Sequence, residues 1–408
     1  MPAAGPDRQR NVEWSVVTHY LDHAATTPML PAALEALIEV SRQVGNPSSL
    51  HTSGRAARAV VEEARERIGA ALGARPSEVV FTSGGTEADN LAVKGTWLAR
   101  RAGDPALNGV VASGIEHHAV LDPVEYLEGS RGVDVTWLEP DRCGHVSPDT
   151  LREGLAAGGI AVASVMWANN EVGTIQPVAE LAAVAREHGV PFHTDAVQAI
   201  AHLPVRFDDS GADLMTVSAH KIGGPVGVGA LLARRDAPIV PIAHGGGQER
   251  QVRSGTLDAA GIHSFAVALE ETVAHRDVEA QRVLALRDRP LEGAVGLGLG
   301  ITVSGCWTAG DATKRLPGNA HLLVPGCEGD SLLYLLDAAG VECSTGSACQ
   351  AGVPQPSHVL LAMGHTEAQA RGALRLSLGH TSTEADVDAF LAALPGVVER
   401  ARRASGLV

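Results

Sequence analysis

V-V-F-T-S-G-G-T-E-A-D-N-L-A-V, residues 79 to 93, reads as a buried strand that enters a glycine turn and then a helix. Seven apolar runs of strand length occur between residues 79 and 233, and helical stretches alternate with them. Further helical patterns cover 32–43 and 54–72. Strands interleaved with helices favour a mostly parallel sheet, so we expect an α/β fold with a large domain of this kind.

The pattern changes after about residue 274. A long stretch rich in arginine and glutamate is predicted to be a helix, and irregular strands and a terminal helix from Thr383 follow it. We expect these residues to form a second, smaller α/β domain, because the regular alternation of strands and helices stops before them.

Lys221 is one of three lysines and stands in V-S-A-H-K-I-G-G-P-V-G-V-G, residues 217–229. An apolar strand is predicted to end there in a glycine-rich turn. A lysine amine is nucleophilic only when deprotonated, which requires a partly dry pocket that lowers its pKa. A surface lysine in an ordinary loop is the simpler interpretation, so a chemical function for Lys221 needs a second group nearby.

Asp195 provides that second group. V-P-F-H-T-D-A-V-Q-A, residues 190–199, is predicted to be a short buried strand that runs into a helix, with Asp195 at the strand end. Chemistry on pyridoxal phosphate needs a lysine for the Schiff base and a carboxylate that keeps the pyridine nitrogen protonated. Lys221 and Asp195 fit these functions, and Gln198 is placed to hydrogen-bond the phenolate oxygen of the cofactor. Taken alone, Asp195 is equally well explained as a helix N-cap.

The glycine turn of the first stretch is a candidate phosphate site. Amides at a helix N-terminus bind anions, Gly85 allows close approach, and Thr86 offers a hydroxyl. Ser218 could add a second hydroxyl. S-G-G-T is also an ordinary turn between a strand and a helix, so the motif gains weight only beside Lys221 and Asp195.

Seven further motifs are spread in order along the chain. They are L-D-H-A-A-T-T-P at 21–28, G-N-P-S-S-L-H at 45–51, E-H-H-A-V-L-D at 116–122, A-N-N-E-V-G-T at 168–174, G-G-G-Q-E-R-Q-V-R-S-G-T at 245–256, C-S-T-G-S-A-C at 343–349 and A-L-R-L-S-L-G at 373–379. With these motifs the chain resembles the NifS- and IscS-like cysteine desulfurases of the class-V aminotransferase family. The likeness spans nearly the whole sequence.

This resemblance implies the α/β fold of the fold-type I pyridoxal-phosphate-dependent transferases. The large domain, expected at 31–274, would hold a mostly parallel seven-stranded sheet. The smaller C-terminal α/β domain would combine 275–408 with 19–30, whose strand folds back onto it. Residues 1–18 are expected to be a flexible extension. The active site would lie between the domains and between the subunits of a homodimer.

The resemblance also assigns functions to single residues. Lys221 would hold pyridoxal 5′-phosphate covalently, and His117 would stack on its ring and assist proton transfer. The remaining cofactor contacts would be Gly85, Thr86, Asp195, Gln198, Ser218, His220 and, from a neighbouring subunit, Thr256. Arg375 would bind the substrate carboxylate bidentately, beside Asn170 and Asn46.

Cys349 would accept sulfur. In the implied reaction L-cysteine becomes L-alanine: Lys221 moves the Cα proton, the Cys349 thiolate attacks the substrate sulfur, and a persulfide remains for a sulfur-acceptor protein of iron–sulfur cluster assembly or tRNA thiolation. The small, glycine- and proline-bearing residues around Cys349 suit a loop that carries sulfur outward. Alternatives are a selenocysteine lyase or an aminotransferase, which would keep Lys221 and Asp195, and a scaffold for sulfur acceptors that has lost catalysis.

The other cysteines are Cys143, Cys306, Cys327 and Cys343, and none forms a C-x-x-C pair. We therefore expect neither a disulfide framework nor a zinc site. Cys343 is expected to be a buried thiol, and a disulfide with Cys349 is the alternative. The adjacent histidines at 117 and 118 lack an acidic or cysteine ligand that would complete a set, so no metal is predicted.

Composition agrees with an ordinary soluble enzyme. The 408 residues are 45% hydrophobic, and the formal net charge of −15 disfavours nonspecific binding of nucleic acid. No apolar stretch suits a membrane span or a signal peptide. With few cysteines, these features favour a cytoplasmic protein without a membrane or nucleic-acid partner.

Overall fold

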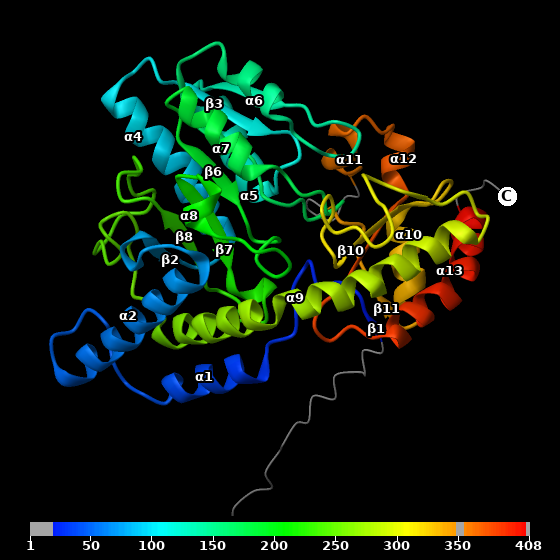
Figure 1. Ribbon diagram of the computed structural model, residues 1–408, viewed down its shortest axis with the longest axis horizontal. Helices are drawn as coiled ribbons and strands as arrows, with labels where there is room; N and C mark the ends of the chain where they lie inside the picture. The colour runs from blue at the N-terminus through cyan, green and yellow to red at the C-terminus, as the bar shows by residue number, and fades with distance from the viewer. Residues whose placement is uncertain (1–18, 348–354, 405–408) are drawn as a thin grey trace, which may run out of the picture.

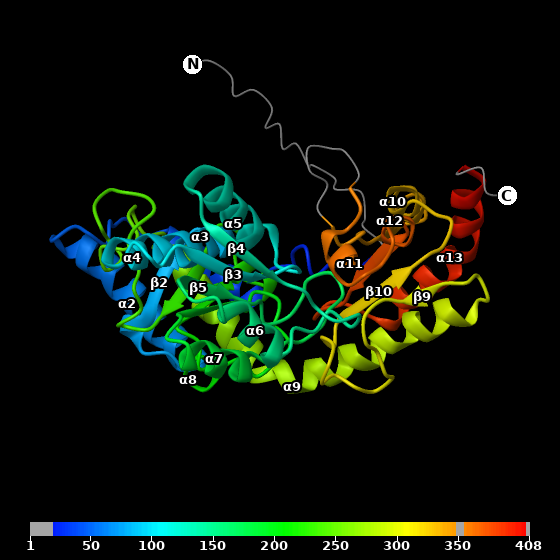
Figure 2. The same ribbon diagram turned by 90° about the horizontal axis from the view of Figure 1, so that it is seen from above.

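The computed structural model describes residues 19–347 and 355–404, which form two lobes (Figure 1). The large lobe is built on a seven-stranded sheet, and the small lobe on a three-stranded sheet with a two-stranded pair. Helix α9 (Ala259–Gly296) runs along both lobes on one side of the molecule (Figure 2). Among the described residues, no helix combines the length and the apolar character that crossing a bilayer requires.

The seven-stranded sheet confirms the predicted α/β fold. In spatial order it contains β2 (Val79–Thr82), β8 (Gly229–Ala233), β7 (Leu214–Ser218), β6 (Phe192–Asp195), β5 (Ile160–Ser164), β3 (Gly109–Ser113) and β4 (Asp134–Leu138). Only β8 runs antiparallel to its neighbours. All strands except β4 are buried along their whole length, because helices cover both faces of a sheet of this type.

The helices of the large lobe follow the predicted pattern. They are α1 (Pro31–Ser41), α2 (Thr52–Leu72), α3 (Gly85–Asn90), α4 (Thr96–Gly103), α5 (His118–Arg131), α6 (Pro148–Leu155), α7 (Val178–Glu187) and α8 (Phe207–Ser210). The helix predicted over 54–72 is α2, which ends at Gly73 in the left-handed conformation that favours glycine. Helices α1 and α2 both pack against α9.

The small lobe draws on both ends of the described chain. Its sheets are β12 (Ala373–Ser377), β10 (Asn319–Leu323) and β9 (Thr302–Val303), and the pair of β1 (His19–Tyr20) with β11 (Val341–Glu342). Its helices are α10 (Gly329–Asp337), α11 (His358–Ala362), α12 (Glu367–Arg371) and α13 (Glu384–Ala404). Leu21, next to β1, is buried in the same core as Leu376 and Phe390.

Two helix predictions differ from the structure. The long helix begins at Ala259, where Asp258 accepts the Gly261 amide as N-cap, well before the composition changes. No helix follows Asp195. Residues 197–202 form turns instead, and Pro204, which restricts the residue before it to extended conformations, comes soon after them.

Cysteine spacing predicts no disulfide framework, and the described residues contain a single disulfide that the spacing did not indicate. Cys143 and Cys306 are bonded to each other, with Cα atoms 4.8 Å apart, and they are 163 positions apart in the sequence. Their pairing depends on two loops of different lobes meeting in space, so spacing along the chain carries no signal of it. Cys327 and Cys343 are free thiols, and burial raises the pKa of Cys343 to about 12.

An ion pair inside the large lobe gives a test of the packing. On α2, Arg65 donates to Glu249 through two bonds of 2.8 and 2.7 Å, and Glu249 also accepts the amide of Phe81 at 2.9 Å. Two residues along the same helix, Arg67 makes a similar pair with Glu270, whose side chain is 44% exposed against 2% for Glu249.

We expect Glu249→Gln to lower the free energy of unfolding by roughly 3 kcal/mol, because it leaves the buried Arg65 guanidinium with only an exposed counter-charge, that of Glu62. The matched change Glu270→Gln should cost less than about 1 kcal/mol, since solvent screens an exposed pair. Urea midpoints of the two variants and the parent measure the difference. Equal midpoints for both variants would contradict a stabilising function for the buried pair.

Candidate active site

A cavity of about 420 Å³ lies where the lobes meet. Residues from the ends of large-lobe strands, from the N-terminal segment and from β12 line it. Ten of the predicted site residues are among them: Gly85, Thr86, His117, Asn170, Asp195, Gln198, Ser218, His220, Lys221 and Arg375. The cavity therefore collects side chains that are distant in sequence.

Sheet topology explains this convergence. Strands β6 and β7 are parallel neighbours, and Asp195 at the end of β6 pairs with Thr216 of β7. Ser218 ends β7, and the turn to Lys221 follows it directly. The carboxyl ends of parallel strands lie at one sheet edge, which is where α/β proteins bind ligands.

The turn after β2 forms an anion cradle at the same edge. Gly84 has a φ of +146°, a backbone conformation that glycine alone adopts readily. The first intrahelical bond runs from the Ala88 amide to the Gly84 carbonyl at 3.2 Å, so the amides of Gly85 and Thr86 precede the helical ladder. Beside Gly85, the Ser218 hydroxyl is buried and has no hydrogen-bond partner among the described residues. These donors fit a phosphate group.

Asp195 forms the buried end of the cavity. One of its carboxyl oxygens accepts the Val197 amide at 2.8 Å. Burial, reinforced by the nearby carboxyl of Asp89, raises the pKa of Asp195 to about 8. The ionised form of a buried acid is stabilised by a partner that carries a proton or a positive charge, and a protonated pyridine nitrogen is such a partner.

Lys221 is held in a dry environment. Its Nζ donates to the carbonyls of Ala24 and Ala25 at 2.5 and 2.6 Å. Burial, and then the positive charge of Arg375, lower the pKa of Lys221 to about 8. At pH 7 about a tenth of the amine is therefore unprotonated, far more than for an ordinary lysine, and covalent chemistry on a carbonyl requires this form.

Two histidines face the cavity in their neutral form. His117 is the N-cap of α5, and its Nδ1 accepts the Ala119 amide at 3.1 Å, which leaves Nε2 as the nitrogen that carries hydrogen. Burial by the cavity walls, followed by the charge of Lys221, lowers the pKa of His117 to about 4. The same two causes lower the pKa of His220 to about 4.

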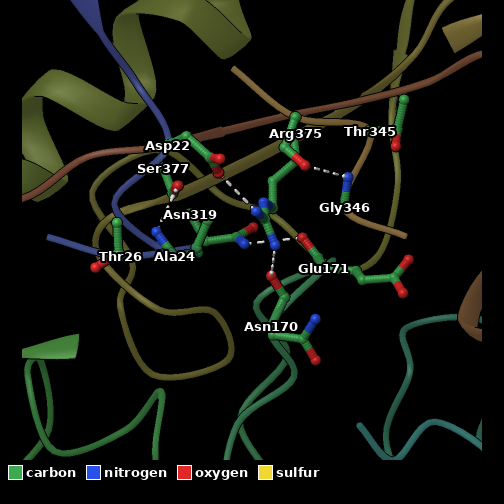
Figure 3. A network of polar contacts seen from close by, with 12 residues as sticks. Asp22, Ala24, Thr26, Asn170, Glu171, Asn319, Thr345, Gly346, Arg375 and Ser377 are labelled. Carbon is green, nitrogen blue, oxygen red and sulfur yellow. Dashed lines mark hydrogen bonds and ion pairs between the residues drawn. The ribbon is translucent and has the colours of Figure 1, made fainter. Parts of the chain in front are cut away.

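Arg375 lies at the junction of the lobes, 4% exposed (Figure 3). Its Nη2 pairs with Asp22 at 2.7 Å, and its Nη1 donates to the Asn170 carbonyl at 2.9 Å. Nε is buried without a hydrogen-bond partner in the described part of the chain. A buried guanidinium with a spare donor is suited to a carboxylate ligand.

Gln198 lines the cavity, and its side chain hydrogen-bonds the protein backbone. Its Nε2 donates to the Ala24 carbonyl at 2.9 Å, so the side chain helps to hold the N-terminal segment over Lys221.

Sequence reasoning missed two acids of this site. Asp22 stands in the first motif, but its pairing with Arg375 depends on the return of the N-terminal segment to β12. Asp89 is 1% exposed, and burial raises its pKa to about 7. Its position four residues after Gly85, on the same helix face, was a signal that could have identified it.

Three predicted residues lie outside this group. Asn46 is on the surface, where it accepts the Ser48 amide at 2.9 Å, and Thr256 is exposed; neither lines the cavity. Cys349 lies outside the described residues. Within 19–347 and 355–404, no cluster of three histidine, cysteine or acidic side chains is arranged to hold a metal ion.

Comparison with known proteins agrees with this geometry. The model of the family "Aminotransferase class-V" matches residues 19–390. An "IscS-like cysteine desulfurase" of Mycobacterium tuberculosis is 58% identical over 95% of this chain and 98% of its own length. A "Cysteine desulfurase IscS" of Dictyoglomus turgidum is 42% identical over 95% of this chain and 96% of its own.

Solved structures give the same result. A "NifS-like protein" superposes with a TM-score of 0.83 at 34% identity, covering 94% of this chain and 98% of that one. A NifS-like protein from Rickettsia africae superposes with a TM-score of 0.81 at 30% identity, covering 93% and 99%. The chain therefore belongs to the class-V aminotransferase family and, within it, to the NifS- and IscS-like cysteine desulfurases.

Proposed function

We propose that this protein is a pyridoxal 5′-phosphate-dependent cysteine desulfurase that converts L-cysteine to L-alanine and takes the sulfur onto Cys349. The observation that carries the proposal is the single cavity that joins an amine of lowered pKa, a buried acid and a buried guanidinium. The names of the relatives support the same activity.

The residues present fit the cofactor. The amides of Gly85 and Thr86 and the hydroxyl of Ser218 would hold its phosphate, Asp195 would face its ring nitrogen, and Lys221 would bind its aldehyde carbon. When bound, pyridoxal phosphate supplies an electron-withdrawing ring that makes the Cα proton of an attached amino acid acidic.

The chain's own residues would then perform the remaining steps. Arg375 would bind the substrate carboxylate, and the amine of Lys221, whose pKa is lowered to about 8 in this cavity, would move the Cα proton. The thiolate of Cys349 would attack the substrate sulfur, so that an S–S bond forms as the C–S bond breaks, and the C–S electron pair stays with the substrate carbon, which is then protonated to give alanine. Alanine leaves, and the persulfide on Cys349 passes to an acceptor protein of iron–sulfur cluster assembly or of thiolation.

The assembly is part of the proposal. Thr256 is exposed and does not line the cavity of its own chain, as expected if it completes the phosphate site of a second subunit in a homodimer. We also propose a large domain at 31–274 and a small one formed by 19–30 and 275–408. The boundary at 274 falls inside α9, so one continuous helix would connect the domains.

The decisive experiment incubates the protein with L-cysteine and a reductant and quantifies alanine, sulfide and persulfide. We expect alanine and sulfide in equal amounts, with the persulfide mapped to Cys349 by mass spectrometry. Cys349→Ala should abolish turnover while the visible absorbance of the bound cofactor persists, whereas Cys327→Ala should remain active. A keto acid as product, or an active Cys349→Ala protein, would refute the proposal.

Substrate binding gives a second test. Arg375→Lys should raise the KM for L-cysteine roughly tenfold or more, because a point charge replaces a bidentate fork. Arg371→Lys, an exposed change four residues away, is the matched control and should leave KM unchanged. Retained cofactor absorbance excludes misfolding. A change confined to kcat would assign Arg375 another function.

The lowered pKa of Lys221 predicts how cofactor uptake depends on pH. The rate at which cofactor-free protein regains its visible absorbance with pyridoxal 5′-phosphate should rise as Lys221 loses its proton, with a midpoint near pH 8 rather than 10.5. Stopped-flow absorbance from pH 6.5 to about 9.5 measures it. A rate that is flat below pH 9 would contradict the dry pocket.

A further inference from the structure

The disulfide between Cys143 and Cys306 connects the two lobes. Cys143 lies in the loop between β4 and α6 of the large lobe, and Cys306 in the loop between β9 and β10 of the small lobe. Both residues are half-buried, so small solutes can reach them. The other contacts between these loops are non-covalent, whereas the disulfide is a covalent bond that thiols can break.

Each cysteine stands on a firmly built loop. Asp141 accepts the amides of Cys143 and His145 at 2.8 and 2.9 Å, which fixes the turn that carries Cys143. On the other side, Asp288 of α9 accepts the indole NH of Trp307 at 2.9 Å and the amide of Gly310 at 2.7 Å. The two sulfur atoms are therefore presented to each other by rigid supports.

A buried cation lies against this pair. Arg315 is 1% exposed, donates to the carbonyl of Cys306 at 3.2 Å, and also donates to the carbonyl of Ser304. Its Nη1 is buried and has no hydrogen-bond partner in the described parts of the chain. A buried positive charge favours the thiolate of a neighbouring cysteine, which is the reactive form in thiol–disulfide exchange.

Two hydrogen bonds and one short loop connect the cysteine pair to the guanidinium of Arg375. Thr174 donates its hydroxyl proton to the Cys143 carbonyl at 2.5 Å. The loop from Asn169 to Thr174 is closed on itself, since the Asn169 amide bonds the Thr174 carbonyl at 2.9 Å. At its other end, the Asn170 carbonyl accepts Nη1 of Arg375 at 2.9 Å (Figure 3). A change at the disulfide is thus transmitted through one small loop to Arg375.

We propose that Cys143 and Cys306 are a reversible oxidation site, at which low-molecular-weight disulfides close the bond and thiols open it, and that the closed bond holds the 169–174 loop in place against Arg375. Closure begins when one protein thiolate attacks the small disulfide, releasing one thiol and leaving a mixed disulfide. The second protein thiolate then attacks the mixed disulfide, and the second small thiol leaves. The protein loses two electrons, the small disulfide gains them, and the two protein protons end on the released thiols.

The proposal has a structural and a kinetic consequence. Closing a loop of this length limits the unfolded chain and should raise the melting temperature by roughly 5 °C. A fixed 169–174 loop preorganises the carboxylate site, so the KM for L-cysteine should be about threefold lower in the oxidised protein, with a smaller change in kcat. The kinetic consequence rests on the proposed function, and the structural one does not.

The test uses wild-type protein with its cofactor, equilibrated in glutathione buffers of graded ratio and then alkylated. We expect a cross-linked peptide that joins Cys143 to Cys306. Its amount and the melting temperature should rise together as the buffer becomes more oxidising. Cys143→Ser and Cys306→Ser should each abolish both shifts, and the double variant should equal either single variant. Because all variants keep Cys349, oxidation elsewhere affects them alike. Alanine formed in the first turnover, measured without added reductant, gives KM.

The outcomes separate the two proposals. No cross-linked peptide at any ratio, shifts that persist in the serine variants, or a bond that forms without changing melting temperature or KM would each overturn the oxidation site. Loss of alanine formation in every protein would refute the proposed function, while the peptide map and the melting curves still decide the bond.

Discussion

The guanidinium of Arg375 is the interaction on which the arrangement of the two lobes depends. It lies on a small-lobe strand, pairs with Asp22 from the N-terminal segment and binds the carbonyl of Asn170 from the large lobe. A buried cation is costly unless it is paired and hydrogen-bonded, so the three segments must meet for any of them to be stable there. The same group lines the cavity, so a ligand bound there would contact the side chain that joins the lobes.

Burial, more than strong charge, sets the pKa values of the groups in the cavity. Burial lowers the pKa of Lys221 and His117 and raises that of Asp195 and Asp89, so each group moves toward its neutral form. Neutral groups with pKa values between about 7 and 8, as for Lys221 and both acids, exchange protons readily near physiological pH.

Local patterns predicted the large lobe well, because each strand, turn and helix there is formed by a continuous segment with its own pattern of apolar residues and glycines. Lys221 and Asp195 could be identified since both follow apolar strands, and parallel strands bring their ends to one edge. The contacts of Asp22 could not be predicted, because the N-terminal segment makes them with residues near the other end of the chain. The Cys143–Cys306 bond escaped for the same reason. Long-range pairing leaves no periodicity in a single sequence, and family motifs supplied only part of what was missing.

The return of the N-terminal segment has a consequence for biosynthesis. Asp22 and its partner are 353 positions apart, and β1 pairs with a strand near the other end of the chain. At ribosomal speeds of 5–20 residues per second, the first strand waits roughly 20 to 70 s for its partners. During that time the large lobe can fold, but Leu21 and the neighbouring edge remain uncovered. Nascent chains are therefore exposed to misassociation at Leu21 and the edge of β1, and the cavity can close only after β12 has been made.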